Sequence, residues 1–266
     1  MKSIHKYFIA SLILFIAGLA QTKSQCTNLE DINFKFGEKI SYQVYYNWTF
    51  IWLSAGEVYF HVNKKEIDNR TVYHFDSYGK SHKEYDWFFK VRDHFQSYVD
   101  STSFKPLFFH RNSFEGGYFV NNKYRFDHNN KLIYSYIEST KIPYYEDTLK
   151  MPNCIFDVLS IIYYSRNIDY DKYAVNEKIP ITLIIDNEIF ELYIRYLGKE
   201  KIKTRNGEVF NCIKFRPLLV EGTIFSEGEH MNVWVTDDKN KIPVLVEAKI
   251  LVGSIKAYLD TYEGTR

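Results

Sequence analysis

The sequence predicts a mainly β protein, built as one strongly curved antiparallel sheet or open β-barrel with a single main helix near residues 154–167 packed on it. Three observations predict this class. Apolar and polar residues alternate through most of the chain, turn residues recur about every ten positions, and aromatic residues make up 18% of the chain. Alternation marks half-buried strands, short turns join antiparallel neighbours, and flat aromatic side chains pack well on a pleated sheet.

Before the helix, the alternation predicts a run of strands. In the first of them Ile40, Tyr42 and Val44 share one face, with Lys39 and Ser41 on the other. The predicted strands cover residues 39–46, 58–62, 72–77, 95–99, 107–114, 118–126 and 132–137. Turn signals are the pairs Asp68-Asn69, Gly116-Gly117, Asn121-Asn122 and Asn129-Asn130. Residues 83–90 are expected to form a short turn of helix.

Residues 154–167 change the pattern to a helical one. Ile155, Leu159 and Ile162 recur at the spacing of one helix face, and Asn153 is a suitable N-cap. We expect this apolar stripe to face the concave side of the sheet.

After the helix the alternation resumes. The predicted strands cover residues 179–186, 188–197, 199–205, 208–215, 230–236, 244–252 and 254–262. Asp186-Asn187 and Asn206-Gly207 are expected to form tight hairpin turns. Because no linker rich in Pro, Gly or Ser divides the chain, residues 26–266 are expected to form a single β-rich domain.

The first 25 residues have the order of a signal peptide. Lys2 and Lys6 precede an apolar run over residues 8–20, and a polar stretch with small residues follows. A run of 13 apolar residues is too short for a membrane-spanning helix, which needs roughly 20 residues. No later segment reaches that length, so no transmembrane segment is expected in the mature chain. The sequence therefore predicts an exported, secreted protein that is periplasmic or outer-membrane-associated.

The three cysteines leave two alternatives open. Cys26 follows the leader directly, where a lipoprotein carries its acylated cysteine, and it is the candidate lipidation site. The preceding Lys23-Ser24-Gln25 matches a lipobox poorly. Cys154 and Cys212 are expected to be buried thiols, and the alternative is that they pair with each other.

Composition argues against several classes of function. The formal net charge is +1, so no nucleic-acid partner is expected. The histidines lack the spacing of a metal motif and no G-x-S-x-G sequence is present, so we assign no catalytic residue, metal or cofactor. Carboxylates that could pair in space, as in a glycosidase, remain an alternative. These candidates are Glu115, Asp127, Glu227 and Glu229.

Several segments together resemble a known family. They are residues 37–42, 55–57, 91–93, 98–100, Pro106, 124–127, 210–217, 222–225, 233–238 (Val-Trp-Val-Thr-Asp-Asp), Pro243-Val244 and 252–255. They resemble the exported bacterial domain-of-unknown-function family 3108 over nearly all of the mature chain. The resemblance implies a curved antiparallel sheet or open barrel in an envelope protein typical of the Bacteroidetes. It implies no catalytic residue.

The expected function is a non-catalytic binding or structural role in the cell envelope. Abundant aromatic side chains could line a groove on the curved sheet, with a lipid, a polysaccharide or an envelope protein as partner. The alternative is a hydrolase that acts on an envelope polymer through paired carboxylates.

Overall fold

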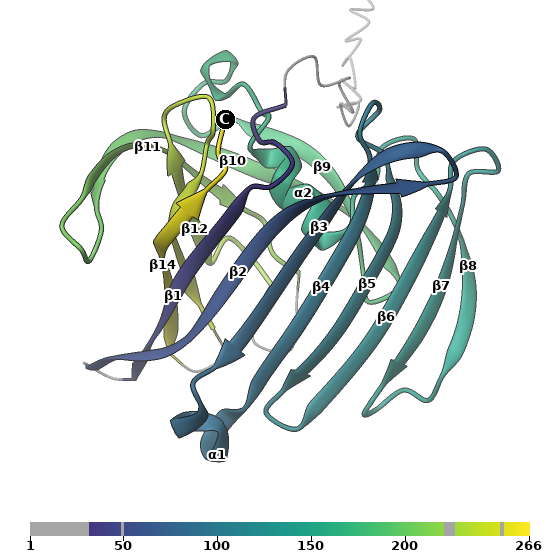
Figure 1. Cartoon of the computed structure of the whole chain (residues 1–266), viewed down its shortest axis with the longest axis horizontal. Helices are drawn as coiled ribbons and strands as arrows, with labels where there is room; N and C mark the ends of the chain where they lie inside the picture. Colours follow the sequence, from purple (N-terminus) through teal and green to yellow (C-terminus); the bar gives the residue numbers. More distant parts are fainter. Residues whose placement is uncertain (1–31, 49–50, 221–226, 251–252) are drawn as a thin grey trace, which may run out of the picture.

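The computed structural model describes residues 32–48, 51–220, 227–250 and 253–266. Within these ranges the chain forms one antiparallel sheet with one main helix (Figure 1). None of the helices in the described part of the chain has the length and hydrophobicity needed to span a bilayer.

The elements follow one another as a series of hairpins interrupted by the helix. In the first half of the chain the strands are β1 (Lys39–Trp48), β2 (Ile51–Ile67), β3 (Arg70–Ser81), β4 (Val91–Asp100), β5 (Pro106–Glu115), β6 (Tyr118–Asp127), β7 (Leu132–Ser139) and β8 (Tyr145–Lys150). The helical elements are η1 (Lys83–Tyr85), α1 (Asp86–Phe89), α2 (Val158–Ser165) and η2 (Tyr170–Lys172). The strands of the second half are β9 (Lys178–Ile185), β10 (Glu188–Lys203), β11 (Val209–Pro217), β12 (Met231–Thr236), β13 (Pro243–Lys249) and β14 (Ser254–Glu263).

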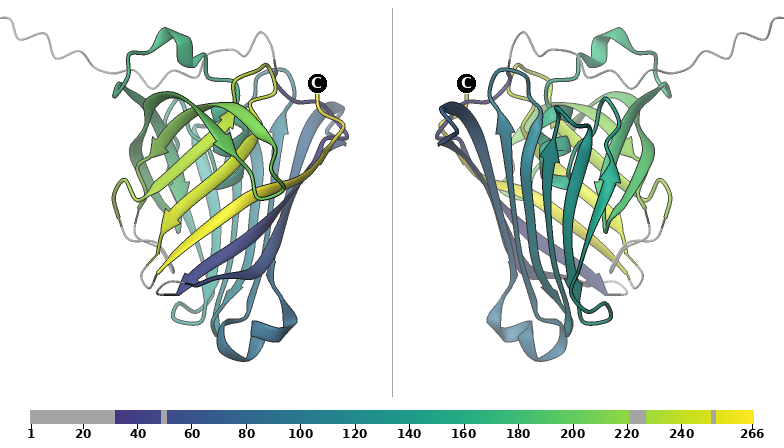
Figure 2. Two further views of the ribbon diagram at one scale, coloured as in Figure 1. Left: turned by 90° about the vertical axis from the view of Figure 1, so that its left-hand side faces the viewer. Right: turned by 90° about the vertical axis from the view of Figure 1, so that its right-hand side faces the viewer.

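The fourteen strands have the order β8-β7-β6-β5-β4-β3-β2-β1-β14-β13-β12-β11-β10-β9. The sheet curls so that β1–β8 and β9–β14 face each other, with α2 between them (Figure 2). Strands β8 and β9 stand at the two ends of this order and do not pair with each other in the described residues. The protein is therefore the open, strongly curved barrel that the sequence predicted.

Helix α2 begins later than expected. Phe156 pairs with Leu183 of β9 as an extended residue, so the segment before the helix covers part of the free β9 edge. The N-cap is therefore Asp157 and not Asn153. Its Oδ1 accepts hydrogen bonds from the backbone N–H groups of Leu159 and Ser160 at 2.9 and 2.8 Å. This satisfies two donors that the first turn of a helix otherwise leaves unpaired.

The expected strand pattern needs three corrections. Asn121-Asn122 lies inside β6 and is not a turn, because β6 runs unbroken through it. The strands expected at 188–197 and 199–205 form the single strand β10, which bends at a bulge near Gly198. Strand β8 was not predicted, because nearly all of its side chains are exposed and it lacks an apolar alternation. Residues 251–252 of the last strand but one lie outside the described residues.

Candidate functional site

The concave side of the sheet is filled around α2. The stripe that was expected to face it does so, since Ile155 and Leu159 are buried and Ile162 packs against the same core. The rings of Phe75 and Tyr163 stack with their centroids 3.8 Å apart. Around α2 the protein's own side chains therefore occupy the concave groove in which a ligand was expected.

The open seam of the barrel is bridged by the β9–β10 turn. Asp186 and Asn187 both have positive φ, 47° and 65°, as a two-residue hairpin turn requires. Asp186 accepts hydrogen bonds from Arg111 at 3.2 Å and from Asn122 at 3.0 Å, both on the inner face of the opposite wall. The backbone N–H of Asn187 donates to the Tyr124 hydroxyl at 3.1 Å. These contacts hold the two halves of the sheet together where no strand pairing does.

Two carboxyl groups lie together on the inner face beside this turn. Burial and the neighbouring Glu115 carboxylate raise the pKa of Asp93 to about 7. Asp93 Oδ1 and Glu115 Oε2 are buried and have no hydrogen-bond partner among the described protein atoms. Arg111 lies 3.8 Å from Glu115 and donates to Ser113. Like charges at short range disfavour two ionised groups, so the arrangement fits a carboxyl pair with one proton between them.

The other carboxylates singled out in the sequence are not brought together with Glu115. Asp127 ends β6, at the end of the β5–β6 hairpin away from Glu115. It accepts hydrogen bonds from the backbone and side chain of Asn130 in a turn. Glu229 forms an ion pair with Arg195 at 2.6 Å. The Arg195 hydrogen bonds lower the pKa of Glu229 to about 2, which keeps it ionised. Glu227 is exposed before β12. The pairing partner of Glu115 is therefore Asp93, which the sequence did not single out.

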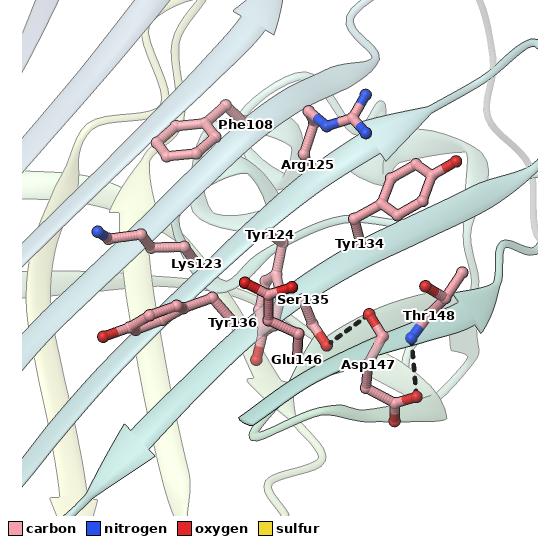
Figure 3. Close-up of a pocket in the computed structure, with 10 residues that line it drawn as sticks. All are labelled: Phe108, Lys123, Tyr124, Arg125, Tyr134, Ser135, Tyr136, Glu146, Asp147 and Thr148. Atoms are coloured by element: carbon pink, nitrogen blue, oxygen red, sulfur yellow. Dashed lines mark hydrogen bonds between the residues drawn. The ribbon is translucent and has the colours of Figure 1, made fainter. Parts of the chain in front are cut away.

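A hollow of about 660 Å³ lies over β5–β8, mainly on the outer face of the sheet. Its lining residues are Phe108, Lys123, Tyr124, Arg125, Tyr134, Ser135, Tyr136, Glu146, Asp147 and Thr148 (Figure 3). Alternation along β6 and β7 explains the outward side chains. Tyr124 and Ser135 are buried on the inner face, so their neighbours Lys123, Arg125 and Tyr134 point outward.

Cations lie over the aromatic rings of this hollow. The Arg125 guanidinium is 4.2 Å from the ring centroid of Tyr134, and the Lys123 ammonium is 4.9 Å from that of Tyr136. Neither cation forms an ion pair with another residue in the described part of the chain. Two acids also line the hollow, Glu146 and Asp147, and Glu146 accepts a hydrogen bond from the Tyr144 hydroxyl. The hollow therefore offers two oriented positive charges and flat apolar rings.

The outer-face histidines have protein partners. His94 lies 2.7 Å from Asp76, His110 2.9 Å from the Asn121 side chain, and His128 2.7 Å from the carbonyl oxygen of Pro106. No group of three or more metal-ligating side chains with the geometry of a metal site occurs in the described ranges.

The two described cysteines differ. Cys154 is disulfide-bonded, so the expectation of a buried thiol is wrong there. Cys212 is a free, fully buried thiol, as expected. They do not pair with each other, because Cys154 belongs to the core around α2 and Cys212 to a separate cluster with Trp234. Cys26 lies outside the described residues, and its lipidation stays a prediction.

The sequence alone did not identify the Asp93–Glu115 carboxyl pair or the cation–tyrosine contacts of the hollow, because both depend on the strand register. Asp93 lies opposite Ser113 in the β4–β5 pairing, which sets it diagonally from Glu115. Lys123 lies opposite Tyr136, and Arg125 opposite Tyr134, in the β6–β7 pairing. The available signal was the alternation of cations and tyrosines on two neighbouring predicted strands, but it acquires meaning only when the register is known.

Comparison with known proteins places the fold and the family. No curated protein matches the chain. The chain is similar to a crystal structure described as a β-barrel-like protein of domain of unknown function DUF1849 from Brucella abortus. That match has a TM-score of 0.57 at 8% identity, and covers 89% of this chain and 100% of the other. At this identity the likeness concerns the fold alone. The model of the family described as "Protein of unknown function (DUF3108)" matches residues 41–260, so the chain belongs to this family.

Proposed function

We propose that this protein is a non-catalytic binding protein of the bacterial cell envelope, and that the hollow on the outer face of β5–β8 binds an acidic polysaccharide. The single observation that carries the proposal is the pair of cations, Lys123 and Arg125, held over tyrosine rings without acidic partners among the described residues.

The geometry of the cations selects an acidic ligand. A guanidinium stacked on a ring keeps its edge N–H groups available, and these suit the two oxygens of a carboxylate or sulfate group. A neighbouring ammonium adds a second, less directional charge. Repeated acidic groups along a polymer can bind both cations at once. A single small anion would bind them more weakly, because it carries one acidic group.

The aromatic rings favour a saccharide as the carrier of those charges. Phe108 and Tyr136 are half-buried on the outer face, where their rings offer apolar contact, and the Tyr136 hydroxyl donates a hydrogen bond to Glu138 at 2.9 Å, which fixes its ring. A hollow with a few placed polar groups among aromatic side chains is the usual form of a ligand site. The rings can contact the apolar face of a sugar while the cations meet its acidic substituents.

A lipid bound inside the curved sheet is the alternative ligand, and the structure supports it less well than an acidic polysaccharide. An acyl chain needs an apolar cavity, and the core around α2 occupies the concave side there. The surface that remains is the outer hollow, whose charged groups do not suit an acyl chain.

Location in the envelope is part of the proposal. It rests on the predicted leader, residues 1–25, which lies outside the described residues. The intact mass of the protein recovered from the exported fraction tests it. Cleavage between residues 20 and 26 is expected, a diacylglyceryl addition on Cys26 would establish a lipoprotein, and an N-terminus still at Met1 would refute export.

The binding experiment compares alginate, an acidic polysaccharide, with neutral dextran in calorimetry on the purified exported protein. Alginate is expected to bind with strong salt dependence and dextran is not. Lys123→Ser/Arg125→Ser should abolish the binding. Lys201→Ser/Lys203→Ser removes two exposed cations from β10 and is the matched control. Equal binding by the two double variants would refute the site.

A second candidate is the hydrolase, which the Asp93–Glu115 pair favours. A carboxyl group whose pKa is raised to about 7 and which lies beside a second carboxyl group can serve as one member of an acid–base pair. Release of reducing ends from envelope polysaccharide, abolished by Asp93→Asn and by Glu115→Gln, would establish this function. Absence of turnover in the wild-type protein would refute it.

A further inference from the structure

The end of the barrel that carries α1 displays the two most exposed aromatic side chains of the described residues. The chain leaves β3 at Ser81 and enters β4 at Val91, so α1 lies at the end of the sheet where these strands meet (Figure 1). Trp87 is 84% exposed there and Phe88 63%. Burying side chains of this size normally stabilises a protein, so their display is a feature that needs an explanation.

The connection between β7 and β8 lies at the same end, because the strands alternate in direction. It carries Ile142 and Tyr144, which are 43% and 52% exposed. The connections at the opposite end of the same strands are polar. They contain Asp68-Asn69, Ser101-Thr102-Ser103 and Asn129-Asn130. Among the connections of β2–β8, the end that carries α1 is therefore the more apolar, and we call the opposite end the polar end.

Helix α1 is held firmly in this exposed position. Asp86 accepts hydrogen bonds from Arg92 at 2.6 Å and from the Ser81 hydroxyl at 2.6 Å. On the other side the ring of Phe89 rests on Gly116 of the β5–β6 turn, leaving no room for a Cβ there. These contacts fix the first and last residues of α1, so that Trp87 and Phe88 between them project outward.

Lysines lie near the exposed aromatic side chains in the same connections. The Lys90 ammonium lies 5.5 Å from the Phe114 ring centroid, and the Lys141 ammonium lies 5.5 Å from that of Tyr118. Lys83 is exposed on η1, and the acid exposed beside it is Glu84. Asp86 is neutralised by Arg92. Among the described residues of the tip, the three lysines Lys83, Lys90 and Lys141 therefore outnumber the two exposed acids, Glu84 and Glu146, the second of which accepts a hydrogen bond from Tyr144.

We propose that this apolar end docks on the surface of a lipid bilayer. We call the set Lys83, Trp87, Phe88, Lys90, Lys141, Ile142 and Tyr144 the docking tip. Tryptophan and tyrosine prefer the boundary between headgroups and acyl chains, where one part of the side chain is apolar and the other wet. The nearby lysines can reach anionic headgroups.

The shape of the docking tip favours a bilayer over a protein partner. α1 protrudes beyond the ends of the strands in both side views (Figure 2). A protruding tip can enter a fluid surface without a preformed counterpart, whereas a protein partner would need a matching groove. The docking tip adjoins the polysaccharide hollow at Tyr144, whose ring centroid lies 4.7 Å from that of Tyr136, but Trp87 and Phe88 lie on a separate connection and line no part of the hollow.

Cosedimentation with vesicles tests the docking tip. The exported protein is mixed with vesicles of phosphatidylethanolamine and phosphatidylglycerol in a 3:1 ratio. Trp87→Ser/Phe88→Ser should weaken partitioning by at least about tenfold, since each buried aromatic side chain contributes more than a tenfold factor. The matched control, Val209→Ser/Tyr262→Ser, removes two side chains that are 61% and 47% exposed at the polar end, and should bind as the wild type.

A second measurement reports on the tip even when the N-terminus associates with the membrane by itself. Brominated lipids quench tryptophans that enter the acyl region. The quenched fraction of emission should fall in Trp87→Phe, which keeps an aromatic side chain, by the share that Trp87 contributes over the tryptophans of β1 and β2 at the same end of the sheet. Lys83→Glu/Lys141→Glu should weaken binding to anionic vesicles and leave binding to phosphatidylcholine vesicles unchanged.

Equal partitioning of Trp87→Ser/Phe88→Ser and the control would overturn the proposal. Loss of dimerisation in that variant, without vesicle binding by the wild type, would also overturn it, in favour of self-association.

Discussion

The ion pair between Glu38 and Arg166 offers the sharpest test of how the fold is held together. Two short hydrogen bonds, 2.6 and 2.9 Å long, join the guanidinium to the carboxylate, and both residues are no more than 2% exposed. Arg166 also donates to the backbone oxygens of Asn33 at 3.2 Å and Asn240 at 3.0 Å. The guanidinium therefore ties the end of α2 to the segment before β1 and to the β12–β13 turn.

Glu38→Gln removes the negative charge and nearly preserves the shape. An uncompensated buried charge typically costs about 3–5 kcal/mol. For a domain of this size roughly 2–4 °C of Tm accompany each kcal/mol, so Tm should fall by roughly 6–20 °C. Thermal unfolding followed by circular dichroism measures the change, and urea unfolding gives the free energy directly.

Two controls separate this reasoning from a general effect of mutation. Glu66→Gln removes one partner of the exposed pair with Lys64, 3.6 Å away, and should leave Tm almost unchanged. Glu38→Met/Arg166→Met removes both buried charges, and should be less destabilised than Glu38→Gln. If Glu38→Gln unfolds at the same temperature as Glu66→Gln, the pair is not the buried, mutually dependent unit described here.

Three other predictions concern the core, the carboxyl pair and the disulfide. Leu159→Ala should cost about 2–5 kcal/mol in urea unfolding, because it opens a cavity where α2 meets the sheet. Burial raises the pKa of Asp93 to about 7, so the folded state holds a proton that the unfolded chain releases, and Tm should fall as pH rises from about 4 to 7. Asp93→Asn should flatten that fall, whereas exposed Glu191→Gln should not. Cys154 is disulfide-bonded and Cys212 is free, so non-reducing peptide mapping should recover Cys154 in a disulfide-linked peptide and Cys212 as a thiol, and alkylation of Cys154 without prior reduction would contradict this.

The sequence predicted those parts of the fold that depend on local patterns. Asp186-Asn187 forms a tight turn because both residue types tolerate positive φ, and the pair of residue types alone is enough to predict it. β8 escaped prediction because it is an edge strand held by backbone hydrogen bonds to β7, with little burial to impose an apolar alternation. Asn122 was taken as a turn signal, but tertiary contact with Asp186 overrides its local preference.

The functional surfaces were harder to predict because they depend on which faces meet. Alternation placed Lys123 and Tyr136 on strands, but the register that brings them together is a property of the hairpin. The prediction of an open concave groove was wrong around α2 for a related reason. Many aromatic side chains can either line a groove or fill it. The stacking of Phe75 on Tyr163 shows that here they fill it. The docking tip is visible in the sequence as Trp87-Phe88, but its exposure is not.

The two proposed surfaces together predict one orientation on a membrane. Lys123 and Arg125 lie over the middle and polar part of β6, whereas Trp87 projects from the opposite end of the sheet. A protein docked through Trp87 would therefore keep the hollow free, facing sideways above the bilayer. Vesicle-bound protein should pellet alginate, Lys123→Ser/Arg125→Ser should pellet without alginate, and Trp87→Ser/Phe88→Ser should bind alginate in the supernatant. Mutually exclusive binding of vesicles and alginate to the wild type would refute this orientation, because it would require the two surfaces to overlap.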